Sequence, residues 1–448
     1  MTRSRLLLAA LALAAVAVPL AGQDEVVHPR PIVIIGGTLF DGTGAPPRRN
    51  DAIVIRDGRI TDIGLSAARR APRDARLIEG TGKWIVPGFV DAAVRLTRSG
   101  NPGPASTSVS VDIRRSPAQY LRAYLCSGIT TVLDVGGPAW TFDLRDGRAD
   151  EALSPAIETT GPSLALVTAP GPGTAAPDDL LAASSPDAAA AIVDRLLPSK
   201  PALVAVRVSA AGGPVEPDPR FANAAVAAAH ARKLRALVEA STLADLRIAL
   251  DAGADVVVSR VAEPIDDGTV QRIVRQKVTI VPVLAIDDAR QRLQAGETTA
   301  TGQESACAPT VSLDALAAWK HPPRPDAAGG PAPDPARALA GQQENVRRLA
   351  IAGAVIVAGS GAGSERVFHG PSLHREFELL ADAGLTPAQI ILSATREAAI
   401  AIGRQATLGQ IKEGMAGDLL VLGADPLIDI RNAAKITHTI RAGALYER

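Results

Sequence analysis

The chain has 448 residues, 47% of them hydrophobic, which is enough apolar material for one large domain and a smaller one beside it. Its 47 Lys and Arg residues balance 47 Asp and Glu residues, so neither a nucleic acid nor an anionic membrane surface is the expected partner. With only three Trp, three Tyr and six Phe, the core is expected to consist of aliphatic side chains.

The first 22 residues have the pattern of a secretory signal peptide. Arg3 and Arg5 form a basic start, residues 6–20 form an apolar run, and small residues follow. A transmembrane anchor is the alternative, but the run is shorter than the ~20 apolar residues that a bilayer requires. We therefore expect a cleaved signal at 1–22, a periplasmic or extracellular location, and no membrane attachment after cleavage.

Short β-rich segments with glycine turns occur near both ends of the chain, in residues 30–86 and 404–448. Asp57-Gly58 is a typical two-residue hairpin turn between two such segments. The predicted strands of the two ends are 32–39, 52–56, 59–63, 408–411, 418–422 and 436–442.

Strands and helices alternate in residues 87–403, as they do in parallel βα units, so the chain belongs to the α/β class. The first strand is an apolar run that passes through Pro87-Gly88 and ends at a polar place. The predicted strands are 84–96, 129–134, 157–160, 203–208, 234–240, 255–259, 278–284 and 355–358. The predicted helices are 117–127, 222–233, 243–252, 337–352, 373–383 and 387–402.

Residues 287–336 follow the seventh of these strands and show no clear periodicity. They contain the Pro-rich run 321–325 and the Gly-rich run 329–333. Loops of this length are usually functional covers or disordered segments. We expect a mobile cover, with plain disorder as the alternative.

The two cysteines, Cys126 and Cys307, could form a disulfide in a secreted protein. Cys126 falls on a predicted helix just before Gly128, where a small buried residue would serve. We therefore favour an unpaired core cysteine over a disulfide.

Three motifs carry a family resemblance: residues 36–42 (GGTLFDG), 84–92 (WIVPGFVDA) and 414–419 (GMAGDL). Together they resemble the amidohydrolase superfamily, in particular its imidazolonepropionase-like and prolidase-like branch, over residues 32–448. The resemblance implies a (β/α)8 TIM-like barrel at 87–403, beside a small β-sandwich formed by 30–86 and 404–448. It also places the segment 287–336 on the C-terminal face of the barrel, where such enzymes keep their sites.

The same resemblance implies a divalent metal, such as zinc, at the barrel mouth. The family holds the metal with Asp-Ala-His-x-His on the first strand, a carboxylated lysine on the fourth, histidines on the fifth and sixth, and an aspartate after the eighth. In this chain all six ligand positions have changed; they are Ala93, Arg95, Ala205, Glu239, Ser259 and Gly361, with Arg207 in place of Ala205 if the fourth strand shifts by two. A methyl group cannot coordinate a metal and a guanidinium repels one, so we expect no metal cofactor.

The six histidines do not rebuild such a site, because none shows metal-ligand spacing. His374 and Glu378 are four residues apart on a predicted helix, but such a pair is usually a solvated face. We hypothesise instead that Arg95 and Glu239 form an ion pair, with Arg207 near it, where the metal would be. The alternative is that each side chain reaches water separately at an open mouth.

Three functions remain from the sequence. The first is a secreted, metal-free relative without catalytic residues that binds a small carboxylate ligand or a partner through Arg95, Arg207 and Glu239. The second is an active amidohydrolase that acts on C–N bonds through a rearranged site. The third is a scaffold that folds and self-associates as a homo-oligomer without a small-molecule role.

Overall fold

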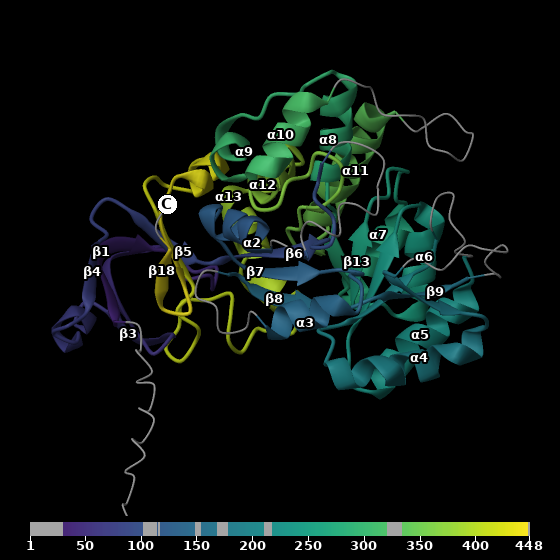
Figure 1. The fold of residues 1–448 in the computed structure, drawn as a ribbon, viewed down its shortest axis with the longest axis horizontal. Helices are drawn as coiled ribbons and strands as arrows, with labels where there is room; N and C mark the ends of the chain where they lie inside the picture. Colours follow the sequence, from purple (N-terminus) through teal and green to yellow (C-terminus); the bar gives the residue numbers. More distant parts are fainter. Residues whose placement is uncertain are drawn as a thin grey trace, which may run out of the picture.

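The structure is a computed structural model that describes residues 30–101, 114, 117–147, 154–167, 178–209, 217–319 and 334–446. The expected signal peptide at 1–22 lies outside the described residues. In the described part of the chain, no helix has the length and apolar character to cross a membrane. Figure 1 shows a strand-rich unit, in purple and yellow, beside a larger unit of strands surrounded by helices.

Both chain ends contribute to one eight-stranded mixed sheet, the end sheet. Its path runs β18-β17-β16-β5-β1-β2-β3, with β4 also paired to β1. The central strand β5 pairs in parallel with β1 and antiparallel with β16, so it joins the two ends of the sequence. The strands are β1 (Ile32–Leu39), β2 (Arg48–Arg56), β3 (Arg59–Gly64), β4 (Arg76–Glu79), β5 (Trp84–Pro87), β16 (Leu419–Leu422), β17 (Ile436–Arg441) and β18 (Ala444–Tyr446).

The predicted hairpin turn at Asp57-Gly58 is present between β2 and β3. Both residues have positive φ, 50° and 74°, as a two-residue turn of this kind requires. Beneath it, buried isoleucines fill the core of the sheet, so the aliphatic core expected from the composition is found here.

The predicted first strand, 84–96, is wrong as a single element because it divides into β5 and β6 (Phe89–Val94). The division falls at Gly88, whose N–H donates to the Asp418 carbonyl at 2.8 Å. A Cβ at Gly88 would lie 2.2 Å from Thr130 Oγ1, so only glycine lets the chain pass from the end sheet into the barrel.

The barrel is built from parallel strands whose interior is apolar. Its strands are β6, β7 (Ile129–Asp134), β8 (Ala156–Thr159), β9 (Ser163–Leu166), β11 (Val204–Arg207), β12 (Ala236–Ala240), β13 (Val256–Ser259), β14 (Thr279–Val281) and β15 (Val355–Ile356). The predicted third strand, 157–160, corresponds to β8, and the chain passes through Gly161 into β9, which was not predicted; β8 pairs with β7 and β9 pairs with β11. Beyond β9 the sheet continues to β10 (Leu180–Ala183).

Hydrogen bonds close the barrel between its first and last strands. The N–H of Ala92 in β6 donates to the Ala358 carbonyl at 3.2 Å, and the N–H of Arg95 donates to the Ala362 carbonyl at 2.8 Å. Small and aliphatic side chains, including Val90, Ala205 and Leu237, fill the interior. The predicted (β/α)8 TIM-like barrel beside a unit from the chain ends is therefore confirmed.

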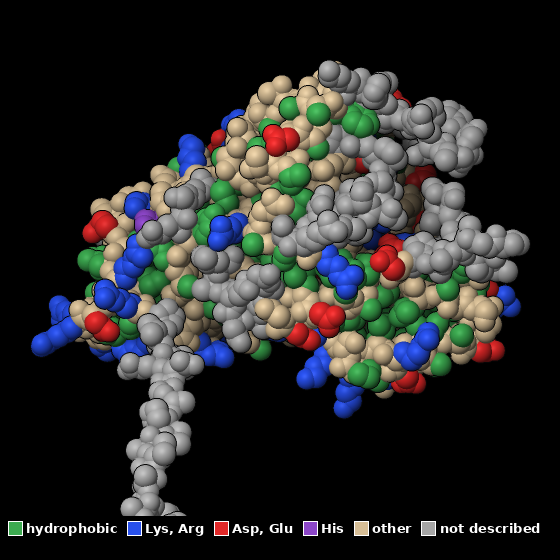
Figure 2. Space-filling view, viewed as in Figure 1, with side chains coloured by type: hydrophobic (Ala, Val, Ile, Leu, Met, Phe, Trp, Pro, Cys, Tyr) green, Lys and Arg blue, Asp and Glu red, His purple; other side chains and the backbone are tan. Residues whose placement is uncertain are grey.

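Helices cover the outside of the barrel. They are α2 (Pro117–Cys126), α3 (Trp140–Asp146), α4 (Ala189–Leu196), α5 (Pro219–Ala231), α6 (Leu243–Ala252), α7 (Asp267–Gln276), α11 (Pro335–Ile351), α12 (Ser372–Asp382), α13 (Pro387–Ser393) and α14 (Arg396–Ala401). The predicted helix 387–402 breaks between α13 and α14, because the carbonyls of Ser393 and Ala394 accept hydrogen bonds from Ala358 and Val90. The charged side chains lie interspersed over the face in Figure 2, as the balanced composition predicts.

The segment 287–336, expected to be a loop without regular structure, is helical over most of its described part. Residues 285–318, here called the cap, form α8 (Ala285–Gln294), α9 (Gly302–Cys307) and α10 (Thr310–Ala318). Glu304 of α9 holds the fully buried Arg366 at 3.3 Å, and Leu293, Leu316 and Phe368 pack together. These contacts fix the cap onto the chain that follows β15; residues 320–333, with His321, lie outside the described part.

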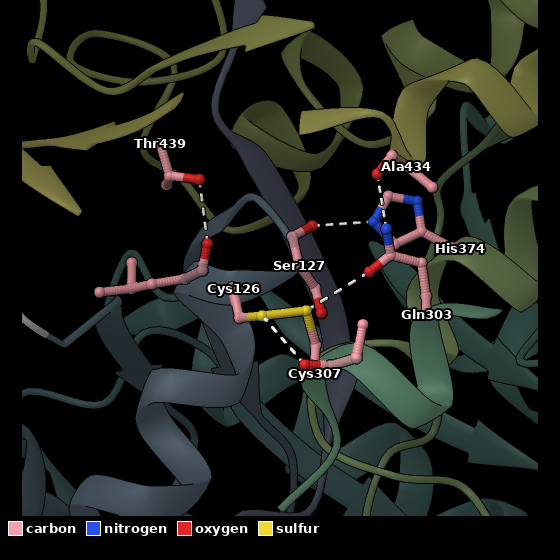
Figure 3. Close-up of a disulfide and its surroundings, with 9 residues drawn as sticks. Cys126, Ser127, Gln303, Cys307, His374, Ala434 and Thr439 are labelled. Carbon is pink, nitrogen blue, oxygen red and sulfur yellow. Dashed lines mark hydrogen bonds between the residues drawn. A yellow bond between two sulfur atoms is a disulfide. The ribbon is translucent and has the colours of Figure 1, made fainter. Parts of the chain in front are cut away.

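The expected unpaired cysteine is also wrong, because Cys126 and Cys307 form a disulfide with a Cα–Cα distance of 5.6 Å. The bond joins the end of α2 to the end of α9, as Figure 3 shows. Beside it, His374 Nε2 lies 2.9 Å from the Ser127 carbonyl, and Thr439 Oγ1 donates to the Leu125 carbonyl at 3.0 Å. Sequence reasoning missed the pairing because it did not expect α9, the helix that brings Cys307 to α2.

Candidate ligand site at the barrel mouth

Arg95, Arg207 and Glu239 meet at the C-terminal ends of three barrel strands. Arg95 follows β6, Arg207 ends β11, and Glu239 lies in β12 directly beside Arg207 in the strand register. Since the carboxyl ends of parallel strands share one edge, this is the barrel mouth. The sequence therefore predicted correctly which strand ends would come together.

The hypothesised ion pair between Arg95 and Glu239 is present. Arg95 Nη2 binds Glu239 Oε2, while Arg207 Nε lies 3.3 Å from Glu239 Oε1. Ser163 Oγ donates to the same Oε1 at 3.2 Å. The alternative, in which each side chain reaches water separately, is wrong.

These contacts determine the charge of Glu239. Burial favours the neutral carboxyl, but the charges of Arg95 and Arg207 outweigh it and lower the pKa of Glu239 to about 2. Glu239 is therefore an anion at neutral pH and only a weak base.

Two further residues complete what we call the arginine cluster: Arg98 and Asp179. Asp179 Oδ2 lies 3.4 Å from Arg98 Nη2 and 3.5 Å from Arg207 Nη2. With Arg95 and Glu239, three guanidiniums face two carboxylates, which leaves one positive charge. Sequence reasoning missed Arg98 and Asp179 because neither belongs to a motif.

Gly136 lies directly against the side chains of the mouth. A Cβ at this residue would lie 2.6 Å from Ser163 Oγ and 3.3 Å from both Arg95 Nη1 and Arg207 Nη2. The Gly-Gly pair after the second strand was the one sequence signal that could have indicated a crowded mouth.

A cavity of about 60 Å³ lies beside the arginine cluster. Its wall has an apolar part and a polar part. The apolar part is Ala93, Val94, Val135, Ala240, Val258, Val283, Ile286 and Gly361; the polar part is Arg95, Glu239, Ser241, Arg260 and Ser364.

A second arginine centre adjoins this cavity. Arg260 Nη2 lies 2.9 Å from Asp287 Oδ1 in α8, and Arg290 Nη1 lies 3.5 Å from the same oxygen. Gln342 Nε2 also donates to Asp287 at 2.7 Å. Two guanidiniums thus share one carboxylate, which adds a second positive charge near the cavity.

The remaining positions of the family's metal site do not supply ligands. Ala93 and Ala205 are buried among the aliphatic side chains of the barrel interior. Ser259 Oγ accepts a long hydrogen bond from the Val261 N–H at 3.4 Å and does not line the cavity. A Cβ at Gly361 would lie 2.6 Å from Ile286 Cδ1, so Ile286 fills the space of an aspartate side chain.

The residues present therefore do not fit the divalent metal that the family implies. Arg95 and Arg207 are permanent cations, and Glu239 is already bound to both. Within the described residues, no three His, Cys, Asp or Glu side chains are grouped so that they could hold a metal ion.

Asp91, the aspartate of the motif 84–92, has a structural role. Its carboxyl accepts hydrogen bonds from Ser360 N at 2.8 Å and Ser360 Oγ at 2.5 Å, and so ties β6 to the segment after β15. Its complete burial raises the pKa to about 7, although the Ser360 contacts oppose this. Asp134, held by Leu96 N and Thr159 Oγ1, behaves alike, with burial raising its pKa to about 6.

Two buried histidines support the mouth from outside the cavity. His369 Nε2 donates to the Arg98 carbonyl at 2.6 Å, and its Nδ1 accepts from Tyr124 OH at 2.6 Å. Burial lowers the pKa of His369 to about 4, so it stays neutral at physiological pH. His374, expected on a solvated face, is buried against the end of α2 instead.

A larger cleft lies elsewhere in the described structure. It has a volume of about 820 Å³ and is bounded by α8, α9, α12 and the short helix η4 (Ile430–Ala434). Two arginines that line this cleft already form ion pairs with carboxylates. Arg292 pairs with Glu304 and Glu297, and Arg375 pairs with Asp288 and Glu378. None of the predicted site residues lines it, so the barrel mouth remains the candidate site.

Comparison with known proteins supports the same fold. A solved structure described as a Xaa-Pro dipeptidase with bound methionine in the active site matches with a TM-score of 0.71 and 20% identity, covering 93% of this chain and 100% of the other. An enamidase from Eubacterium barkeri is 26% identical over 120 residues, which is 27% of this chain and 28% of the enamidase. An imidazolonepropionase from Aromatoleum aromaticum is 41% identical over 56 residues, 12% of this chain and 13% of that protein.

Each of these sequence matches spans less than a third of the curated relative. The match to the family as a whole is much longer. The profile described as "Amidohydrolase family" matches residues 84–445, which include the barrel and the last strands of the end sheet. The chain belongs to the amidohydrolase family.

Proposed function

We propose that this protein is a secreted, metal-free member of the amidohydrolase family that binds a small carboxylate at the barrel mouth and does not catalyse metal-dependent hydrolysis. One observation carries the proposal: the arginine cluster stands where the family places its metal ligands. The ligand's carboxylate would meet fixed guanidiniums, which are the preferred protein partners of that group.

Magnitudes argue against hydrolysis by the remaining groups. A catalytic metal lowers the pKa of its bound water from about 15.7 to about 7, on the order of eight decades in hydroxide at neutral pH. Positioned acid and base groups contribute roughly 10²–10⁴-fold. With a pKa of about 2, Glu239 is a poor base even within that range.

Electrostatics favours an anion. The arginine cluster has one positive charge in excess, and the Arg260–Asp287–Arg290 group adds another. The buried Asp134, which interacts with Arg95 and has a pKa of about 6, offsets one of these charges at neutral pH, so one positive charge is left. Both arginine groups surround a cavity that is partly removed from water, where charge–charge attraction is stronger than at an open surface.

The disulfide supports the secreted location. Disulfides persist in oxidising compartments and are rare in the cytosol. Cys126 and Cys307 are joined in this chain, and the sequence begins with a signal-like segment.

Calorimetric titration with small carboxylates at low ionic strength tests the binding. The double variant Arg95→Ala/Glu239→Ala removes a cation and an anion together, so it tests the site without leaving Glu239 unpaired. We expect its affinity to fall about tenfold or more, the value of a charge-assisted hydrogen bond. Arg70→Ala/Asp62→Ala, which removes an ion pair outside the barrel, is the matched control.

Elemental analysis tests the metal-free assignment. We expect substoichiometric zinc, manganese and iron after purification, and no gain of peptide or amide hydrolysis when these ions are added. Stoichiometric metal that disappears in Glu239→Ala would overturn the proposal in favour of an active amidohydrolase with a rearranged site.

A further inference from the structure

We infer that the ligand is a short-chain aliphatic monocarboxylate whose tail lies in the apolar part of the mouth cavity, and that Ile286 sets the length of the tail. This inference rests on the proposed function, because it specifies which carboxylates the site accepts. It concerns a residue outside the family's ligand positions.

The cavity is amphipathic in a way that matches such a molecule. Val135, Val258, Val283 and Ile286 form an apolar wall, whereas Arg95 and Arg260 lie on the polar wall. A carboxylate bearing a second charge or a polar tail would place that group against valine and isoleucine side chains without a hydrogen-bond partner.

Arg260 has a donor to offer at this wall. Its Nε and Nη2 both face Asp287, at 3.4 Å and 2.9 Å, and within the described residues Nη1 has no such contact. Ser241 and Ser364 also line the cavity and can donate hydroxyl hydrogens. These donors line the same cavity as Arg95, so the head group of the ligand can contact Arg95 and Arg260 together while the Arg95–Glu239 pair stays intact.

Size limits the tail. The cavity measures about 60 Å³, whereas pockets for drug-sized ligands measure roughly 300–1,000 Å³. Such a space holds a few carbon atoms at most.

Ile286 belongs to the apolar wall, where its side chain lies against Gly361, and the structure holds it there. The fully buried Glu376 of α12 accepts hydrogen bonds from the N–H groups of Leu284 at 3.1 Å and Ala285 at 2.8 Å. Both amides lie at the start of α8, immediately before Ile286. Val283 has a φ of 44°, which is rare for a β-branched residue and turns the chain inward at this point.

Glycine at 361 completes the arrangement. Since Ile286 Cδ1 would lie 2.6 Å from a Cβ at that position, the Ile286 side chain occupies the space that an aspartate would need. Shortening Ile286 should open this space to a longer ligand.

The test is a calorimetric titration with straight-chain carboxylates from acetate to octanoate, using the full chain and the variants Ile286→Val and Ile286→Ala. In the wild type we expect the affinity to rise with each methylene by about fourfold, then to fall once the cavity is full. The optimum should move to longer chains in Ile286→Val and further in Ile286→Ala. Ile248→Ala, which removes a half-buried isoleucine from α6, is the control and should leave the optimum unchanged.

The outcomes separate the two proposals. Two outcomes would show that this inference is wrong while the proposed function stands. In the first, carboxylates bind to the wild type with an affinity that does not depend on chain length. In the second, Ile286→Val and Ile286→Ala keep the wild-type optimum of chain length. If no carboxylate of this series binds but another small carboxylate does, this inference is wrong and the proposed function stands; if no small carboxylate of either kind binds, the proposed function itself is wrong.

Discussion

At the scale of single residues, Arg95 determines what the barrel mouth can do, at a position where the family resemblance implies a histidine. A neutral imidazole donates an electron pair to a metal, whereas a guanidinium brings its own positive charge. Glu239, at another histidine position, then becomes the counter-ion of Arg95 and Arg207. The positive charge of the site therefore comes from arginine side chains and not from a bound metal ion.

Removing Arg95 alone should be more harmful than removing the whole pair. Arg95→Ala leaves Glu239 partly buried with one guanidinium fewer, and we expect a loss of about 3 kcal/mol in the free energy of unfolding, the low end for a broken buried pair. Arg95→Ala/Glu239→Ala should recover part of that loss. Urea unfolding measures both, and strictly additive effects of the two substitutions would contradict the coupling.

Restoring the family's aspartate should not be tolerated. Gly361 has a φ of 68° and Ile286 lies against it, so Gly361→Asp meets both backbone strain and a steric clash. We expect a lower melting temperature for Gly361→Asp, with partial recovery when Ile286→Ala is added. Gly403→Asp, at a φ of 76° with nothing nearby, is the control that isolates the strain.

Sequence reasoning found those site residues that lie within recognisable sequence motifs. Arg95 and Glu239 could be placed because the residues around them identify the strand ends. Arg98, Asp179 and Ile286 could not, because their roles depend on how separate segments meet at the mouth. No local sequence pattern indicates contacts between segments that are distant in the sequence.

At the scale of elements, the cap is the largest departure from the sequence prediction. Its three helices are short, and their polar residues face partners that the sequence does not reveal, as with Glu304 against Arg366. Among the barrel helices, α2, α5, α6, α11 and α12 were predicted close to their bounds, whereas α3, α4 and α7 were missed. Capping residues mark some of the predicted helices; α6, with Thr242 and Asp245 forming a capping box, is an example.

The disulfide should stabilise the cap more than the barrel. It joins two residues separated by 181 positions, so we expect Cys126→Ser/Cys307→Ser to lower the free energy of unfolding by about 2–5 kcal/mol. Hydrogen exchange should speed up in α9 and the end of α2 while β12 and β13 remain protected. Equal acceleration in those strands would show that the bond stabilises the barrel as a whole.

At the scale of the whole molecule, buried carboxyls give the stability a pH dependence. Burial raises the pKa of Asp91 to about 7, of Asp134 to about 6 and of Glu376 to about 8. Such groups stabilise the folded chain below their unfolded pKa near 4, and this stability is lost as the pH rises through the folded values. Glu239 acts in the opposite direction, since its lowered pKa gives stability that is lost between about pH 4.5 and pH 2.

We therefore expect the free energy of unfolding to be highest near pH 4–5 and to decline toward pH 8. Urea unfolding at several pH values measures the curve. Glu376→Gln should flatten the decline, because it removes the carboxyl with the highest pKa. A stability that rises steadily from pH 5 to pH 8 would contradict this account.

The end sheet can be completed only late in the synthesis of the chain. Strand β5 pairs on one side with β1, from the beginning of the chain, and on the other with β16, from its last 30 residues. The edge of β5 that pairs with β16 therefore stays unpaired until nearly the entire polypeptide has been synthesised. A chain interrupted before β16 would keep that edge exposed, so a release of unfinished chains should show itself first as aggregation through β5.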